Sequence, residues 1–377
     1  MTPVLPRAQP GEIGLDADRL EVAYRLLAVW TTAPDPVIPA GAILVGRRGR
    51  VIEPRLFGRQ GPEADAPLIH DDAMFLTASI SKPVVYLGAM ILVERGLLSL
   101  TDPVTRYVPE FANHDKGSVL VRQLFTHTSG LPDMLDDNVE LRASHTPRQG
   151  FLDRASSETR LLFEPGTRVS YQSMGTAVVA EIIQRLTHKP FDEFLNEEVF
   201  HPLGMRSTSF GSRGFDPDRL LRVRTSPETA DADWNWNSDY WRQLGSPWGG
   251  MFSTPDDLAV LCQMMLNGGV LGDARILSPA TVRVMTTNRL YEERKLPESI
   301  ARSKPWGLGW RLNHPGTPDS WGDLLGPNVY GHHGATGTLI WIDPDTEVFC
   351  VLLTSADRSG QPWVLTHLSN VVASAVL

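Results

Sequence analysis

Ser79-Ile80-Ser81-Lys82-Pro83-Val84-Val85 is the stretch that decides how this chain is interpreted, and it opens an apolar segment that runs to Val93. Residues three apart lie on one face of a helix, so Lys82 is expected to reach the Ser79 hydroxyl. A serine hydroxyl is a poor nucleophile until a neighbouring group takes its proton. The positive end of the helix dipole favours an oxyanion there and a lowered pKa for Lys82. The segment predicts a buried helix that starts with a candidate nucleophile and base.

Composition indicates an ordinary globular enzyme of 377 residues, with 42% hydrophobic and 21% charged residues. A net charge of −9 and the lack of basic runs argue against nucleic acid and against an anionic membrane as partners. Cys262 and Cys350 lie in apolar runs, which predicts buried thiols. The first residues do not resemble a signal peptide and no apolar stretch is long enough to span a bilayer, so we expect a cytoplasmic protein.

Strand signals lie near both ends of the chain and helical signals lie between them. Strands are expected at 42–45, 51–57, 307–312, 329–334, 338–342 and 348–353, and helices at 16–30, 79–95, 176–186 and 363–377. The pattern predicts an α+β fold in which an antiparallel sheet, flanked by helices, is built from both chain ends. Residues 1–95 together with 250–377 would form an α/β domain. Residues 96–249 would form an inserted, mostly helical domain, with the active site between the two.

Two further segments supply chemistry that suits Ser79. Tyr171, in Tyr171-Gln172-Ser173, precedes a predicted helix. A phenol near two cations ionises well below its usual pKa of about 10, so Tyr171 is a candidate to take the Ser79 proton and return it to a leaving group. In His332-His333-Gly334-Ala335, the bare Gly334 would let a substrate backbone lie close to a strand. An N–H just after it would join the Ser79 N–H in binding an oxyanion.

The motifs Ser-x-x-Lys, Tyr-x-Ser and His-x-Gly, in this order, resemble the serine β-lactamase-related superfamily. The likeness is to the branch with class C β-lactamases, penicillin-binding-protein-like esterases and D-amino-acid peptidases. Segments 124–132, 202–205 and 249–258 resemble the same branch, and the likeness spans roughly residues 15–375. The resemblance implies a β-lactamase/transpeptidase-like fold and no cofactor.

Carried over residue by residue, the resemblance implies that Ser79 is the acylated nucleophile and that Lys82 is its proton-accepting neighbour. Tyr171 becomes a general base or acid, and the N–H groups of Ser79 and Ala335 become the oxyanion hole. Either Lys82 or Tyr171 is compatible with taking the first proton. His332 stands where β-lactamases of the superfamily carry the lysine of Lys-Thr-Gly.

Departures from the family pattern indicate the substrate. Ser173 replaces the asparagine whose amide grips a β-lactam, and His332 removes a permanent cation for a substrate carboxylate. We therefore expect a serine hydrolase that acts as a carboxylesterase on small or medium acyl esters. A β-lactamase or a D-stereospecific peptidase or amidase is the alternative, and a ligand-binding or sensor protein without turnover is a more distant one. The substrate-binding residues expected are Ser173, His332, His333, Gly334, Trp236, Trp241 and Trp248.

Several of these residues also have structural interpretations. Ser79 is a suitable helix cap, and the tryptophans are equally suited to a core and to an aromatic wall for an acyl group. His332 and His333 would face opposite sides of a strand, and no metal-binding motif accompanies them, so no metal is expected. The partner expected is a small-molecule ester or amide.

Overall fold

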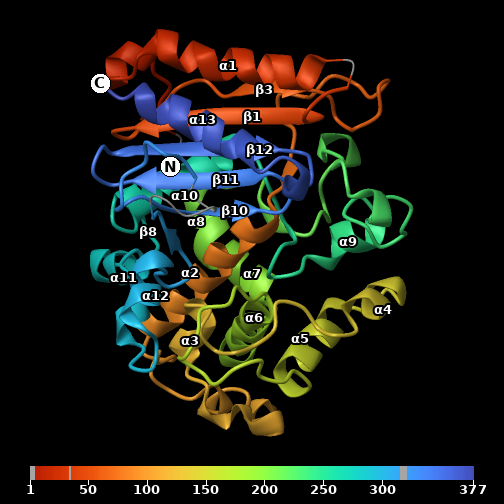
Figure 1. The fold of residues 1–377 in the computed structure, drawn as a ribbon, viewed down its shortest axis with the longest axis vertical. Helices are drawn as coiled ribbons and strands as arrows, with labels where there is room; N and C mark the ends of the chain where they lie inside the picture. The colour runs from red at the N-terminus through yellow and green to blue at the C-terminus, as the bar shows by residue number, and fades with distance from the viewer. Residues whose placement is uncertain (1–4, 34, 315–320) are drawn as a thin grey trace.

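An antiparallel sheet built from both ends of the chain occupies the upper half of the view in Figure 1. The structure, a computed structural model, describes residues 5–33, 35–314 and 321–377. Residues 1–4, 34 and 315–320, which belong to the ranges predicted for the α/β domain, lie outside the described residues. The strand order is β2 (Arg50–Val51), β1 (Ala40–Arg47), β12 (Val348–Thr354), β11 (Thr338–Asp343), β10 (Tyr330–Gly334) and β9 (Arg311–Leu312). β3 (Arg55–Gly58) also pairs with β1.

Side chains on β1 alternate between two cores, as the pleat of a strand requires. Ile43 and Val45 pack in a cluster with α1 (Ala17–Thr32) and α13 (Trp363–Ser374), which cover one face of the sheet. Ala42 and Leu44 belong to the larger core on the other face, where α10 (Pro255–Leu266) contacts β1, β11 and β12. Burial on both faces explains why these strands are apolar throughout.

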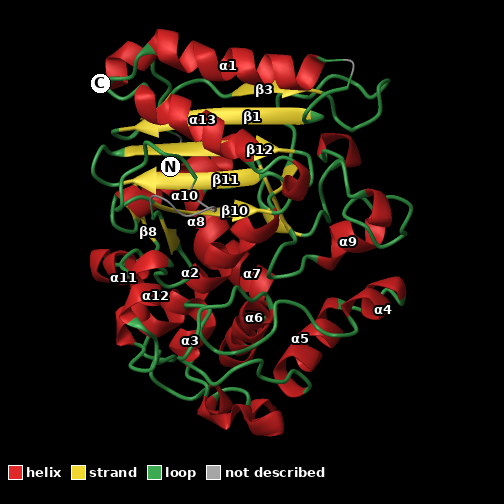
Figure 2. Ribbon diagram, in the orientation of Figure 1, coloured by secondary structure: helices red, strands yellow, loops and turns green. Residues whose placement is uncertain are grey.

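Helices dominate the lower half of the molecule, as Figure 2 shows, and the colours of Figure 1 place most of them in the middle of the chain. The central one is α2 (Ser81–Glu94), which is buried on nearly all sides and packs against α6 (Met174–Thr187). The others are α3 (Val121–Phe125), α4 (Asn138–Ala143), α5 (Arg148–Ser157), α7 (Phe191–Leu195), α8 (His201–Leu203), α9 (Asp239–Leu244), α11 (Pro279–Met285) and α12 (Glu298–Ser303). The 290–306 segment packs on Tyr171, so the C-terminal part of the chain also contacts the helical lobe.

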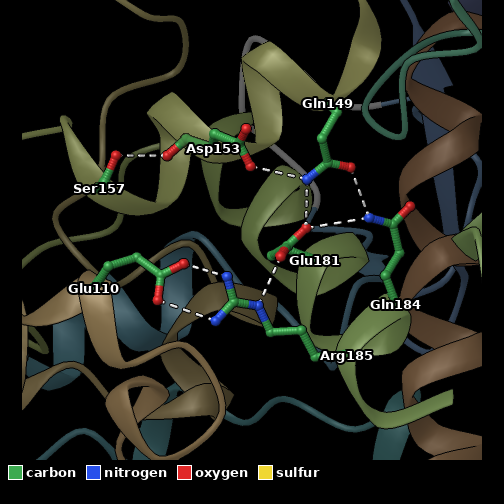
Figure 3. A network of polar contacts seen from close by, with 7 residues as sticks. All are labelled: Glu110, Gln149, Asp153, Ser157, Glu181, Gln184 and Arg185. Carbon is green, nitrogen blue, oxygen red and sulfur yellow. Dashed lines mark hydrogen bonds and ion pairs between the residues drawn. The ribbon is translucent and has the colours of Figure 1, made fainter. Parts of the chain in front are cut away.

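A network of polar contacts holds α6 against its neighbours (Figure 3). Glu181, which is 5% exposed, accepts hydrogen bonds from Arg185 Nε (2.7 Å) and Gln149 Nε2 (3.0 Å). Arg185 also pairs with Glu110 in the 3₁₀ segment η4 (Pro109–Ser118). Because its buried carboxylate is paired and hydrogen-bonded, α6 is fixed in place, and with it the loop that precedes its N-terminus.

Two smaller sheets complete the fold. β4 (Phe75–Leu76), β6 (Met251–Ser253) and β5 (Ser209–Phe210) form one, and β7 (Val270–Leu271) pairs with β8 (Ala274–Arg275) in the other. β4 ends just before Ser79, so its pairing with β6 helps to place that residue. Among the described residues, none of the helices has both the length and the apolar character needed to cross a bilayer.

Candidate active site

Ser79 and Lys82 lie together at the start of α2. Ser79 is in the short 3₁₀ turn η2 (Ala78–Ile80), one turn before the α-helix itself begins at Ser81. Lys82 Nζ lies 3.0 Å from Ser79 Oγ and donates to the carbonyl of Trp248 at 2.9 Å. Lys82 is only 1% exposed. Burial lowers the pKa of Lys82 to about 7, while the negative charge of Asp133 acts in the opposite direction. A large fraction of this lysine is therefore neutral near pH 7.

The backbone before Ser79 adopts an uncommon conformation that side chains hold in place. Ala78 has a φ of 48°, in the left-handed region that non-glycine residues rarely adopt. Ser81 Oγ donates to the Ala78 carbonyl (2.6 Å) and accepts from the Met251 N–H (3.1 Å). These two bonds tie the strained turn to β6, which fixes the direction in which the Ser79 side chain leaves the backbone.

The β10–β11 hairpin clamps the same turn from the other side. Thr336 Oγ1 donates to the Leu76 carbonyl (2.6 Å), and Thr338 Oγ1 donates to the Thr77 carbonyl (2.8 Å). Gly334 is where the two segments approach most closely, since a Cβ there would lie 2.3 Å from Thr77 O. A glycine is therefore needed at position 334 so that the hairpin can pack against this turn. The sequence had suggested a different reason, namely room for a substrate backbone.

Because of this close approach, the two N–H groups of the predicted oxyanion hole belong to segments that lie side by side. Ala335 directly follows Gly334 and is exposed. Its carbonyl accepts from the Arg358 N–H (2.7 Å), whereas its own N–H finds no acceptor in the described part of the chain. An exposed, unsatisfied N–H beside the η2 turn is suited to receive a developing oxyanion together with the N–H of Ser79.

Tyr171 lies in the loop before α6, with its ring 4.7 Å from Lys82 Nζ. The rings of His127, His332 and Trp306 surround it at centroid distances of 4.8, 6.0 and 6.2 Å. Burial raises the pKa of Tyr171, and a hydrogen bond with Ser79 offsets this only in part. The sequence expectation of a lowered phenol pKa was wrong, because desolvation outweighs the nearby positive charges. Tyr171 is a neutral phenol that can pass on a proton.

The Tyr171 loop is anchored by the 127–129 segment. The His127 carbonyl accepts from the Ser170 N–H (2.9 Å), and His127 Nδ1 accepts from the Gln172 N–H (3.2 Å). Ser129 Oγ donates to Gln172 Oε1 (2.5 Å). All three bonds act on the backbone or the side chains next to Tyr171, so they position its phenol.

The Ser173 hydroxyl can act in the site only as a hydrogen-bond acceptor. Its hydroxyl donates to Asp133 Oδ1 at 2.6 Å, and its N–H bonds the Asp133 carbonyl at 3.2 Å. A serine has one hydroxyl proton, so this Ser173 has none left for a substrate carbonyl. The asparagine of the family pattern would offer two N–H donors at this place.

His332 lies beside Tyr171, and His333 does not. His332 Nδ1 bonds the carbonyl of His333 (2.8 Å), so Nδ1 carries the proton and Nε2 is left as an acceptor. Burial, followed by the charge of Lys82, lowers the pKa of His332 to about 3. Nδ1 of His333 instead accepts from Trp321 Nε1 (3.4 Å). The site therefore has a neutral imidazole where the family pattern has an ammonium.

The three candidate tryptophans have different surroundings. Trp241 and Trp248 are 3% and 2% exposed and belong to the main core, the structural interpretation that the sequence left open. Trp248 reaches the site through its carbonyl, which Lys82 contacts. Trp236 is partly buried and lines a cavity of about 180 Å³.

Sequence reasoning did not identify several residues of the site. Asp133 directly follows the 124–132 segment, whose resemblance to the family could have drawn attention to it, whereas no local signal marks Trp306. Thr336 and Thr338 stand beside the His-x-Gly motif, so their spacing could have suggested a clamp. In the described ranges, no group of three or more His, Cys, Asp or Glu side chains has the geometry of a metal site.

Comparisons with known proteins support one family. Residues 29–370 match the family model described as Beta-lactamase. A curated Escherichia coli K12 protein, provisionally named a D-alanyl-D-alanine carboxypeptidase, is 25% identical over 390 residues, covering 95% of this chain and 87% of its own. A penicillin-binding protein homologue from Caulobacter crescentus superposes with a TM-score of 0.75 at 21% identity, covering 96% of this chain and 99% of that one. EstCE1, a hydrolase with promiscuous acyltransferase activity, superposes with a TM-score of 0.73 at 21% identity, covering 96% and 98%.

Proposed function

This chain belongs to the Beta-lactamase family, and we propose that, among these serine hydrolases, it is a carboxylesterase acting on small or medium acyl esters. The acyl-enzyme forms on Ser79. The observation that carries the proposal is the neutral His332, whose ring lies 6.0 Å from that of Tyr171 and whose buried Nε2 has no hydrogen-bond partner, so the site holds a lone pair rather than a cation here. A substrate carboxylate at this place would meet an acceptor. An ester without a carboxylate meets no such penalty.

The geometry supports a specific order of proton transfers. Lys82 in its neutral form accepts the Ser79 proton across 3.0 Å while Oγ attacks the ester carbonyl. The N–H groups of Ser79 and Ala335 stabilise the oxyanion. Tyr171, which stays protonated, passes a proton to the departing alkoxide and is reprotonated from the Lys82 ammonium. Water then attacks the acyl group, and the same groups return Ser79 to its hydroxyl form.

The test combines intact-mass measurement with turnover. Purified protein is mixed with p-nitrophenyl acetate, butyrate and octanoate, and both the +acyl mass and the released phenol are followed. We expect turnover with butyrate and a transient adduct that Ser79→Ala lacks. Unchanged turnover in Ser79→Ala would refute the role of Ser79. A stable adduct without turnover would instead support a sensor.

A second candidate function, that of a peptidase or amidase, is favoured by Arg311. This residue lies on β9, opposite Gly331 of β10, and its charge acts on both His332 and Tyr171. A guanidinium there is suited to a substrate carboxylate, and the E. coli relative is named for such a substrate. Turnover of nitrocefin or of a D-alanyl-D-alanine peptide at a rate near that of p-nitrophenyl butyrate, lost in Arg311→Gln, would favour this candidate over the esterase.

A further inference from the structure

Arg142 on α4 is a largely buried cation held by aromatic rings. Its guanidinium lies 4.3 Å from the ring centroid of Trp241 and 6.0 Å from that of Trp234. Burial lowers the pKa of Arg142 to about 10, so the side chain still carries its charge at neutral pH. The contact between the face of the guanidinium and an indole ring offsets part of the free-energy cost of burying the charge.

One donor on the edge of this guanidinium is buried and unsatisfied. Its five N–H donors point outward in the plane, where stacked rings do not reach them. Within the described ranges no carboxylate pairs with Arg142, and its buried Nε has no hydrogen-bond partner. Two other part-buried arginines of the lobe do have a carboxylate partner, since Arg148 pairs with Asp192 (2.8 Å) and Arg122 with Glu293 (3.1 Å). Arg242 also has a buried Nε without a partner, but it does not line this cavity. A buried N–H without an acceptor is costly to keep. A carboxylate bound beside it would supply that acceptor.

A cavity of about 180 Å³ lies beside Arg142. Its lining includes the indoles of Trp234 and Trp236, the hydroxyls of Ser226 and Thr229, and Asp357. Pockets for drug-sized ligands measure roughly 300–1,000 Å³, so the occupant must be small. Aromatic walls, hydroxyls and one planar cation suit a small carboxylate on a flat or short apolar scaffold.

Two observations relate this cavity to the rest of the molecule. The Asp357 carboxylate is turned toward its own loop, where its Oδ1 accepts from the N–H (2.8 Å) and the hydroxyl (2.6 Å) of Ser359, and it keeps its negative charge. The next residue, Arg358, donates its N–H to the carbonyl of Ala335, the residue of the proposed oxyanion hole. One wall of the cavity is thus directly connected to the turn that carries the Ala335 N–H.

We propose that this cavity is a binding site for a small carboxylate, anchored by Arg142. Binding there needs no chemistry at Ser79, so the inference goes beyond the proposed esterase function. The carboxylate is either a free ligand or the distal group of a substrate that extends from Ser79.

Thermal denaturation with benzoate tests the site directly, with benzamide as the neutral analogue of the same shape and benzylamine as the cationic one. Benzoate should raise the Tm of the wild type, and in Ser79→Ala as well, whereas benzamide and benzylamine should not. Arg142→Met should bind benzoate at least about tenfold more weakly. Without ligand, Arg142→Met should be no less stable than the wild type, because it removes an unpaired buried charge.

Arg142→Lys provides a second variant that keeps the charge and loses the planar fork, and it should also weaken benzoate binding. Kinetics separate the two sources of the carboxylate. If Arg142→Met raises the KM for p-nitrophenyl hydrogen glutarate but not the KM for p-nitrophenyl butyrate, the carboxylate belongs to the substrate. If benzoate changes butyrate hydrolysis of the wild type without competing with the substrate, the carboxylate is that of a free ligand. The proposal is overturned if benzoate leaves the wild-type Tm unchanged, if Arg142→Met responds equally, or if benzylamine binds instead.

Discussion

The pH dependence of ester hydrolysis tests whether Lys82 is the base that accepts the Ser79 proton. With a pKa of about 7, half of Lys82 is neutral at pH 7. The neutral fraction is then about 0.09 at pH 6 and about 0.9 at pH 8, so kcat/KM should rise about tenfold between these values and level off above pH 8. Burial raises the pKa of Tyr171, so we expect no fall in rate up to about pH 10 from its ionisation.

Asp133→Asn should move this profile in a defined direction. The charge of Asp133 favours the ammonium form of Lys82, so its removal should shift the midpoint to lower pH. Lys116 offers a matched control, since it is a second buried lysine whose pKa burial lowers to about 8, and it bonds the Thr159 carbonyl instead. Lys116→Met should leave the midpoint unchanged.

The measurement is kcat/KM for p-nitrophenyl butyrate from pH 5.5 to 9.5, with both products quantified by chromatography because the colour of nitrophenol itself varies with pH. A rate that still rises at pH 9.5, with no levelling above pH 8, would exclude Lys82 as the base and favour Tyr171, whose pKa is raised. A midpoint that rises in Asp133→Asn would refute the electrostatic argument, and an equal shift in Lys116→Met would assign the effect to the whole molecule rather than to the site.

Three further variants test other parts of the structure. Gly334→Ala places a methyl group 2.3 Å from the Thr77 carbonyl, so the hairpin must shift and kcat should fall about tenfold to a hundredfold; Gly326→Ala, where nothing lies within 4 Å, should keep its kcat. Lys82→Met should be more stable than the wild type in urea at pH 7 by about 4 kcal/mol, because the lowered pKa makes the buried ammonium destabilising. The difference should shrink by about 1.4 kcal/mol per pH unit towards pH 10, and a constant difference would contradict the burial argument. His332→Lys adds a like charge near Lys82 and should move the acid limb of the rate profile to lower pH, whereas His332→Gln should leave it in place; equal profiles for the two would contradict this.

The sheet could be predicted from the sequence because its signals are local. Alternation and turn chemistry located β10, β11 and β12 to within a residue or two. The strand expected at 307–312 is shorter, since β9 covers only Arg311–Leu312. Gly309 has a φ of 80° and lies where a Cβ would come within 2.3 Å of the Tyr86 ring. That contact with α2 is tertiary, and no strand pattern reveals it. Likewise Pro54 separates β2 from β3, where one strand was expected.

The active site was predictable where chemistry requires particular residues and unpredictable where the environment sets their properties. The Ser79–Lys82 spacing gave a correct expectation of proximity, since the two side chains meet at 3.0 Å. The protonation state of Tyr171 was misjudged, because the expectation counted neighbouring charges and omitted desolvation. How far a phenol is buried depends on rings such as Trp306, which joins the site from more than a hundred residues away. Such burial is a property of the folded chain.

The residue at position 332 determines which group can act as the base. A lysine there would put a second ammonium near Tyr171 and favour its phenolate. The neutral His332 removes that charge, so burial keeps Tyr171 protonated while the same burial partly deprotonates Lys82. A change from lysine to histidine at 332 therefore has two effects that act together. It removes the cation that would hold a substrate carboxylate, and in the proposed mechanism it transfers the role of base from the phenol to the amine. The proposed substrate preference and the proposed proton-transfer route are thus coupled through one side chain.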